Sequence, residues 1–179
     1  MAIWQWNINF VSRRKLLACF SEIPLEFNDE MLVSLLRLER FSLEELKGSF
    51  DSILSRNTQA WMSAEVLSWG HEDENDVSVS VENSVIEEIG CRFDTRNIDV
   101  ELLKWFIDFA DKSDFLFVID GNKANEKRVI EPKPSIVFEE LDNSKAMLFS
   151  KDPKKFFEDK DYLESINSEI EGEFENCED

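Results

Sequence analysis

The hydrophobic and polar residues of this sequence recur with two periods, and each period predicts one kind of secondary structure. Near the start of the chain, apolar residues at positions 4, 6, 8 and 10 alternate with polar ones. A period of two residues is typical of a strand, with Trp4 and Trp6 on its buried face. Alternation and short apolar runs also predict strands over 61–69, 77–81, 85–96, 115–119 and 128–131.

The strand predicted over 85–96 has acidic residues on both of its sides. Strict alternation would place residues 85, 87, 89, 91 and 93 on one face and the even-numbered residues on the other. Glu87 and Glu88 would then point in opposite directions and could not act together as an acid/base pair. The residues 82–84 are typical of a turn, so this strand should pair antiparallel with 77–81.

Helices are predicted where apolar residues recur every three or four positions after a capping residue. Asn28 can cap a helix that reaches about residue 38, and Ser42 begins a capping box with Glu45. Asp99 can cap a helix to about residue 111 that is apolar around most of its circumference, so we expect it to be buried against the sheet. Shorter helices are predicted over 135–141 and 153–159, whereas 146–149 fits either a strand or a helix.

These elements predict an α+β fold, with a mostly antiparallel sheet of about five or six strands and helices packed on one face. Hydrophobic residues make up 42% of the 179 residues, including 15 Phe and 5 Trp, which is enough for a sizeable core. We expect residues 1–160 to form a single domain. Residues 161–179 hold 8 acidic and no basic side chains, and should form an acidic C-terminal helix or tail that is partly disordered.

The formal net charge of −19 narrows the range of partners. Such a protein repels nucleic-acid phosphates and anionic membrane surfaces, so we expect neither as a partner. The charge is uneven, because residues 1–60 hold 7 basic and 8 acidic side chains whereas 61–160 hold 13 and 23. A localised acidic surface would suit a basic protein partner. A solvated acidic face would give the same count, and mimicry of DNA is disfavoured by the interleaved basic residues. The sequence leaves the oligomeric state open.

The reactive side chains of the sequence do not form a recognisable catalytic set. There is one histidine, His71, and the three cysteines at 19, 91 and 177 include no C-x-x-C pair. A catalytic triad, a zinc site, a disulfide framework and a glycine-rich phosphate loop all need other residues. We therefore expect a non-enzymatic protein without metal or cofactor. No apolar run could span a bilayer and the first residues do not resemble a secretory signal, so we expect a cytoplasmic location.

One group of charged residues is a candidate for partner binding. Glu72, Asp73, Glu74 and Asp76 precede the strand 77–81, and Glu82 follows it. These carboxylates could contact a basic partner. A solvated loop between strands is the simpler explanation. Calcium binding is disfavoured, because the segment lacks the glycine and the final glutamate of an EF-hand.

A second group, Arg92, Asp94 and Arg96, is the candidate for ligand binding. On a strand these residues share one face, and two guanidinium groups beside a carboxylate could clamp a small anionic ligand. The alternative function is therefore a small-ligand-binding protein or an enzyme with a pocket near these residues. The simpler explanation is a ladder of ion pairs in which Asp94 neutralises its neighbours.

Three sequence stretches together resemble small acidic bacterial α+β proteins of uncharacterised type. They are Ile3-Trp4-Gln5-Trp6-Asn7, Ile89-Gly90-Cys91-Arg92-Phe93-Asp94-Thr95-Arg96 and Ser150-Lys151-Asp152-Pro153. Some proteins of this kind are immunity proteins that neutralise a secreted toxin. The resemblance implies a binding function with a basic toxin as partner, and it identifies no individual functional residue.

Overall fold

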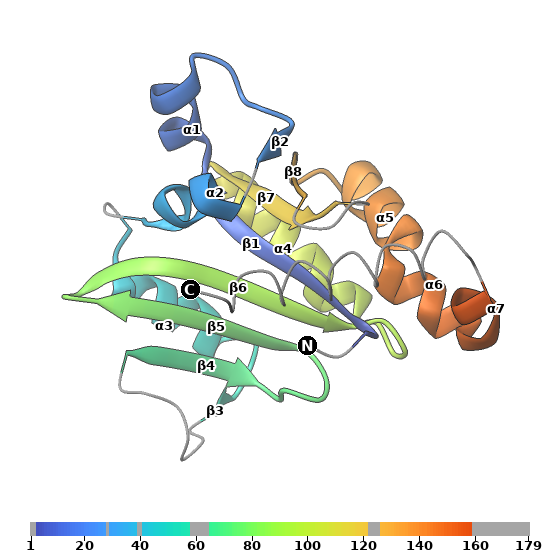
Figure 1. The fold of residues 1–179 in the computed structure, drawn as a ribbon. Coiled ribbons are helices and arrows are strands. Elements are labelled where there is room, and N and C mark those ends of the chain that lie inside the picture. Colours follow the sequence, from blue (N-terminus) through green and yellow to red (C-terminus); the bar gives the residue numbers. More distant parts are fainter. Residues whose placement is uncertain (1–2, 28, 39–40, 58–64, 122–125, 159–179) are drawn as a thin grey trace, which may run out of the picture.

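A computed structural model describes residues 3–27, 29–38, 41–57, 65–121 and 126–158 of the chain. They form an α+β fold around one eight-stranded sheet in which every pair of neighbouring strands is antiparallel (Figure 1). The strands are β1 (Gln5–Ser12), β2 (Glu26–Phe27), β3 (Arg56–Asn57), β4 (Val66–Gly70), β5 (Asp76–Glu82), β6 (Val85–Asp94), β7 (Phe115–Asp120) and β8 (Lys127–Ile130). Their order in the sheet is β2-β8-β7-β1-β6-β5-β4-β3.

The helices are α1 (Arg13–Phe20), α2 (Asp29–Leu36), α3 (Leu43–Asp51), α4 (Val100–Lys112), α5 (Pro134–Asn143), α6 (Lys145–Lys151) and α7 (Pro153–Glu158). The α+β class and the antiparallel sheet are confirmed, and the strand count is higher than expected. The two strands that were not predicted, β2 and β3, have only two residues each. Segments this short carry no readable alternation, so only the tertiary structure reveals them.

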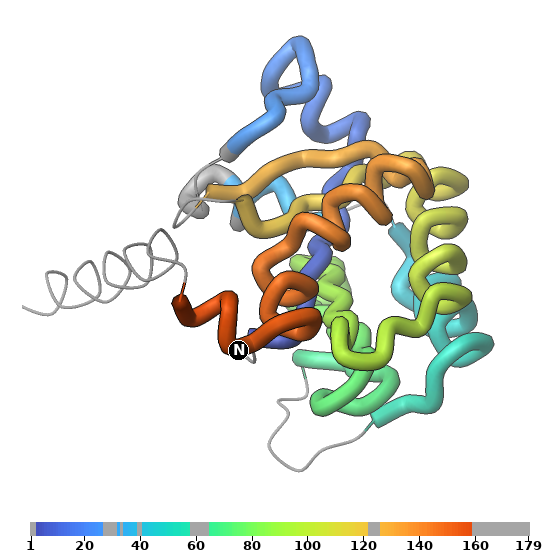
Figure 2. The backbone as a smooth tube through the Cα atoms, turned by 90° about the vertical axis from the view of Figure 1, so that its right-hand side faces the viewer, coloured from blue at the N-terminus to red at the C-terminus, as the bar shows by residue number. Residues whose placement is uncertain are grey.

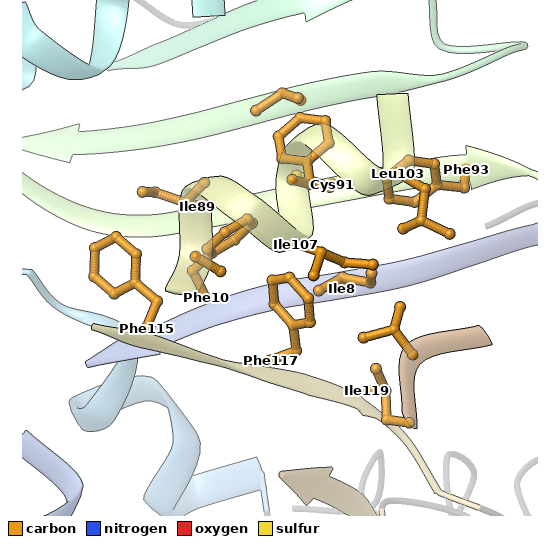
Figure 3. Packing of buried hydrophobic residues seen from close by; sticks show 14 of the residues in the cluster. Ile8, Phe10, Ile89, Cys91, Phe93, Leu103, Ile107, Phe115, Phe117 and Ile119 are labelled. Atoms are coloured by element: carbon orange, nitrogen blue, oxygen red, sulfur yellow. The ribbon is translucent and has the colours of Figure 1, made fainter. Parts of the chain in front are cut away.

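The predicted first strand, β1, is central and pairs with both β6 and β7. Trp6, Ile8 and Phe10 all point to the same face, as their alternation predicted, and are nearly fully buried there. Trp4, which was predicted on the same face, precedes β1 and is only partly buried. On that face the ring of Phe10 makes an edge contact with Phe117, at 5.2 Å between ring centroids (Figure 3). Burial of these large rings is a main source of the stability of the fold.

Helix α4 covers this face of the sheet. The Asp99 side chain caps it by accepting a hydrogen bond from the Leu102 amide at 2.9 Å. Phe106 packs against Phe10 and Phe93, so the helix contacts both β1 and β6. Helices α3, α5 and α6 add buried residues to the same cluster. Together with α7, α5 and α6 lie at the right-hand end of Figure 1, which faces the viewer in Figure 2.

The opposite face of the sheet is covered only in part. Helices α1 and α2 pack there against β1, β7 and β8, in a second apolar cluster that includes Leu16, Leu35, Val11, Leu116 and Val118. The expectation of helices on one face therefore holds for α3 to α6 but not for α1 and α2. The candidate site lies on the polar surface of β4, β5 and β6, in a hollow whose lining residues, within the described ranges, come from strands and a loop and from no helix.

Strand β6 departs from the alternation that the sequence predicts. Opposite β5 the register shifts between Ser80, which pairs with Glu88, and Val81, which pairs with Ile86, so Glu87 is an extra residue in the ladder. This bulge turns Ile86 into the main core, where it is only 1% exposed, on the same side as Ile89. Strict alternation placed Ile86 on the face opposite Ile89, and this prediction was wrong, because a bulge resets the side-chain period and leaves no clear trace in the sequence.

Most other predicted elements are present. The turn after β5 has Asn83 and Ser84 with positive φ, and residues 146–149 lie in helix α6. Helix α1 was not predicted. The Asn28 cap, part of the strand expected over 61–69 and the acidic helix or tail expected over 161–179 lie outside the described residues. In the described part of the chain, none of the helices combines the length and apolar character needed to cross a bilayer.

Candidate functional site

The acidic loop, residues 71–75, connects β4 to β5 and begins after a glycine with an unusual backbone. Gly70 has φ of +83°, and a Cβ atom at this position would lie 2.2 Å from the carbonyl oxygen of Asn75. Only glycine fits here. The loop then closes on itself, because the His71 amide donates to the Asn75 carbonyl at 3.2 Å and the Glu74 amide donates to the His71 carbonyl at 3.0 Å.

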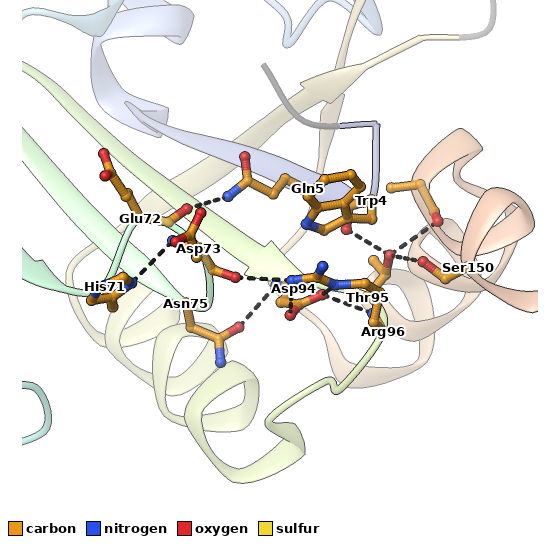
Figure 4. Close-up of polar contacts among 11 residues, drawn as sticks. Trp4, Gln5, His71, Glu72, Asp73, Asn75, Asp94, Thr95, Arg96 and Ser150 are labelled. Carbon is orange, nitrogen blue, oxygen red and sulfur yellow. Dashed lines mark hydrogen bonds and ion pairs between the residues drawn. The ribbon is translucent and has the colours of Figure 1, made fainter.

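Neighbouring strands hold the backbone of the acidic loop in place (Figure 4). Gln5 of β1 donates from Nε2 to the Glu72 carbonyl at 2.6 Å. Arg96 donates from Nη2 to the Asp73 carbonyl at 3.0 Å, and the Asn75 side chain accepts from the Asp94 amide at 3.0 Å. The side chains of Glu72, Asp73 and Glu74 remain exposed. The loop therefore presents three carboxylates on a fixed backbone.

The fourth acidic residue of the predicted set, Asp76, faces a different environment. It lies opposite Arg92 across β5 and β6 and is only 5% exposed. Both of its carboxylate oxygens accept from the Arg92 guanidinium, with 2.7 Å between Nε and Oδ1. This hydrogen bonding raises the pKa of Arg92. Asp76 therefore neutralises a neighbour inside the sheet and is poorly placed for a partner.

Asp94 and Arg96 form a second bidentate pair at the end of β6. Arg96 donates from Nε and Nη2 to the two oxygens of Asp94, each at 2.9 Å. This hydrogen bonding lowers the pKa of Asp94. The guanidinium carbon of Arg96 also lies 4.4 Å from the centroid of the Trp4 ring, a cation–π contact. Each arginine of the predicted clamp is thus bound to its own aspartate, as in a ladder of ion pairs.

Thr95 joins the three stretches on which the resemblance rests. Its hydroxyl oxygen lies 2.7 Å from the Trp4 carbonyl oxygen, 3.0 Å from that of Ala146 and 2.6 Å from the Ser150 hydroxyl. These contacts attach helix α6 to the start of β1 and the end of β6 (Figure 4). The three stretches are therefore neighbours in space, and their contacts are structural.

The acidic loop borders a hollow of about 390 Å³ on the open face of the sheet. The middle of its floor is Gly90, which pairs with Asn9 of β1 on one side and with Ser78 of β5 on the other. Glu88 lies two residues before Gly90 on the same face of β6. The polar residues of the lining are Asn7, Asn9, Asn57, Ser68, Glu72, Asp76, Ser78, Glu88, Arg92, Asp120 and Lys127.

Burial affects the one glutamate in the floor of the hollow. The pKa of Glu88 is raised because burial disfavours its charged form, and the charge of Lys127 opposes this shift. Both cations of the lining already have acidic partners, since Arg92 binds Asp76 and Lys127 binds Asp120 at 2.6 Å. The hollow is therefore acidic, because both of its cations are paired with aspartates of the same lining.

The structure brings together all but one of the residues that the sequence singled out. Asp76 and Arg92 pair at the edge of the hollow beside Glu72, and Asp94 and Arg96 contact the loop that carries Asp73 and Glu74. Glu82 lies at the far end of β5, roughly 20 Å from Asp76 by the rise of a strand. It is exposed beside the turn to β6 and does not belong to the same surface.

The floor of the hollow is formed by four residues that were not predicted from the sequence: Asn9, Ser78, Glu88 and Gly90. The alternation in β1 and β5 does place Asn9 and Ser78 on polar faces. Their meeting around Gly90 depends on the register of three strands, which local alternation does not reveal. Across the described ranges, no group of three or more His, Cys, Asp or Glu side chains is arranged to hold a metal ion.

Comparison with known proteins identified no relative of this chain. No protein-family model, no curated protein and no solved structure matches it. The resemblance to small acidic immunity proteins therefore stays a prediction, and the candidate site stands on its geometry.

Proposed function

We propose that this protein is a non-enzymatic binding protein whose acidic loop contacts a basic protein partner. The observation that supports this proposal best is the fixed backbone of the loop, which holds the exposed carboxylates of Glu72, Asp73 and Glu74. A loop that is ordered before binding loses little conformational freedom when a partner docks. The resemblance described above makes a basic toxin the first candidate, with this protein as its immunity protein.

Electrostatics supports the same proposal. An acidic surface on a protein of net charge −19 attracts basic proteins over distances set by the ionic strength. Such attraction increases the association rate and orients the two molecules as they meet. Asp76 would contribute by holding Arg92 in place, and Glu82 is too distant to share the contact.

The alternative of a small anionic ligand bound by Arg92, Asp94 and Arg96 gains less support. A clamp needs guanidinium donors that face the ligand, whereas two donors of each arginine already bind an aspartate. The hollow beside Arg92 is acidic overall, which disfavours an anion. We therefore propose the protein-binding function in preference to the small-ligand function.

The proposal is tested with the immobilised full-length protein and an extract of its source cells, at about 50 mM and about 500 mM NaCl. Captured proteins are identified by mass spectrometry, purified and titrated by calorimetry. We expect a partner with an isoelectric point above neutrality that is retained at low salt and released at high salt, because screening weakens exposed charge pairs.

Two variants with the same charge separate a specific contact from general attraction. The loop variant carries Glu72→Gln, Asp73→Asn and Glu74→Gln. The control variant carries Asp108→Asn, Asp111→Asn and Glu139→Gln, which removes three exposed charges from α4 and α5. The Kd for the partner should rise at least about tenfold in the loop variant and stay near the wild-type value in the control. Equal effects of both variants, or no basic partner at low salt, would contradict the proposal.

A further inference from the structure

We propose that the hollow on the open sheet face binds the ammonium or guanidinium end of one basic side chain of the partner, with Glu88 as its counter-ion. This inference rests on the function proposed above and assigns a second contact to it. The acidic loop would meet basic residues on the surface of the partner, and the hollow would accept a single lysine or arginine from the same surface.

Three side-chain oxygens surround the place where Gly90 has no side chain. A Cβ atom built on Gly90 would lie 3.1 Å from Asn9 Oδ1, 3.4 Å from Ser78 Oγ and 3.9 Å from Glu88 Oε1. The three oxygens come from three adjacent strands, because Asn9, Gly90 and Ser78 form one row across β1, β6 and β5. Such a set of acceptors suits a group with several N–H donors, which lysine and arginine side chains provide.

The charges around this space favour a cation. Glu88 supplies a carboxylate, and burial makes that carboxylate costly to keep charged without a partner. Arg92 pairs with Asp76, whereas Lys127 pairs with Asp120 and its charge also acts on Glu88, so the four carboxylates of the lining outnumber its two cations. A cation that enters the hollow would gain hydrogen bonds to the ionised carboxylate, which are among the stronger ones in proteins.

The size and position of the hollow fit a side chain. About 390 Å³ exceeds what one guanidinium group needs and is small for a folded element. Because Glu72 belongs to both the acidic loop and the lining of the hollow, a partner seated on the loop would have the hollow within reach.

In the first measurement, ethylguanidinium chloride is titrated into the protein at constant ionic strength, and its binding is observed through the NMR signals of the protein. We expect saturable shifts of the Gly90 and Asn9 amide signals, and smaller or no shifts with tetramethylammonium chloride, which has no N–H donor. Two variants should weaken the binding at least about tenfold: Gly90→Ala, which fills the space, and Glu88→Gln, which removes the charge.

Matched controls exist for both variants. Gly48→Ala adds the same methyl group in α3, where a Cβ has no atom within 4 Å, and Asp108→Asn removes one exposed charge from α4. Both should bind the probe as the wild type does. Saturable shifts confined to the wild type and these controls would support the inference. Absence of such shifts, or shifts that persist in Gly90→Ala, would overturn it.

Failure of this inference can be told apart from failure of the proposed function. If Gly90→Ala and Glu88→Gln bind the captured basic protein as the wild type does, while the loop variant binds it weakly, the hollow is not part of the interface and the loop proposal stands. If the Kd for that protein rises in the two hollow variants and not in Gly48→Ala or Asp108→Asn, the side chain of the partner occupies the hollow. A loop variant limited to Asp73→Asn and Glu74→Gln, which leaves the lining of the hollow intact, should still bind ethylguanidinium.

Discussion

Two glycines of this protein differ in whether an alanine could replace them. Gly70 adopts φ of +83° with a carbonyl oxygen against it, whereas Gly48 lies in helix α3 with open space around it. We predict that Gly70→Ala lowers the free energy of unfolding by more than about 1 kcal/mol, from the positive φ alone. Gly48→Ala should raise it by roughly 0.5–1 kcal/mol, because alanine favours the helix. Urea unfolding measures the change in the free energy of unfolding for each variant.

The Gly70→Ala variant also bears on the acidic loop. A displaced Asn75 carbonyl would disturb the bond from the His71 amide and shift the carboxylates that follow. The Kd for a basic partner should therefore rise in Gly70→Ala and stay unchanged in Gly48→Ala. An unchanged Kd in a destabilised Gly70→Ala protein would show that the loop backbone need not be fixed for binding.

Glu88 is a residue whose charge weakens the fold. Its folded pKa is raised above the ordinary value of about 4.5, chiefly by burial. The stability that belongs to its protonated form is therefore present below the unfolded pKa and is lost as the pH rises through the folded pKa. Glu88→Gln should be more stable than the wild type at pH 7, and this difference should disappear toward pH 3.

Thermal unfolding of Glu88→Gln and Asp108→Asn across this pH range provides the measurement. Asp108 is exposed on α4, so its replacement should give no comparable gain at neutral pH. A Glu88→Gln protein that is less stable than the wild type at pH 7 would mean that the carboxylate already has a strong stabilising partner. A stability cost at Glu88 agrees with a residue that serves binding.

At the scale of elements, helix α4 depends on both its cap and its buried surface. Leu103, Phe106 and Ile107 are nearly fully buried, and Asp99 caps the helix. We predict that Asp99→Ala destabilises the protein by about 1 kcal/mol, the usual effect of removing an N-cap. Asp99→Asn keeps a capping oxygen and loses the charge at the helix N-terminus. It should destabilise the protein by about 0.3–0.5 kcal/mol.

Chemical denaturation at pH 7 measures this pair of variants. Equal losses in Asp99→Ala and Asp99→Asn would show that the charge, and not the capping hydrogen bond, is what matters at this position. No loss in either would mean that packing of Phe106 and its neighbours against the sheet determines the helix start by itself.

At the scale of the whole molecule, the net charge of −19 opposes folding. Several of the described ion pairs lie at the surface, where such pairs contribute little. We therefore predict that the melting temperature rises by roughly 2–4 °C between about 10 mM and about 200 mM NaCl, as salt screens the repulsion between carboxylates. Thermal unfolding in NaCl and in choline chloride of equal ionic strength separates screening from specific sodium binding. A melting temperature that falls with salt would mean that ion pairs outweigh the repulsion.

Local sequence signals predicted the elements well where their cause is local. Alternation in β1 correctly placed Trp6, Ile8 and Phe10 in the core, and Asp99 caps α4 as expected. The bulge at Glu87 and the two-residue strands β2 and β3 were missed. They depend on how each segment pairs with its neighbour in the sheet, which leaves no periodic pattern in the segment itself.

The candidate site likewise has features that the sequence predicted and features that depend on strand pairing. The sequence by itself determined the α+β class, the polar face of each strand and the excess of carboxylates between β4 and β5. Only the tertiary structure decided which carboxylates are exposed, because the register of β5 against β6 places Asp76 opposite Arg92 and leaves Glu72, Asp73 and Glu74 at the surface. The same register sets Asn9 and Ser78 on either side of Gly90 and so creates the hollow. Side-chain period is a local property of the chain, whereas register is a property of strand pairs that meet only in the fold.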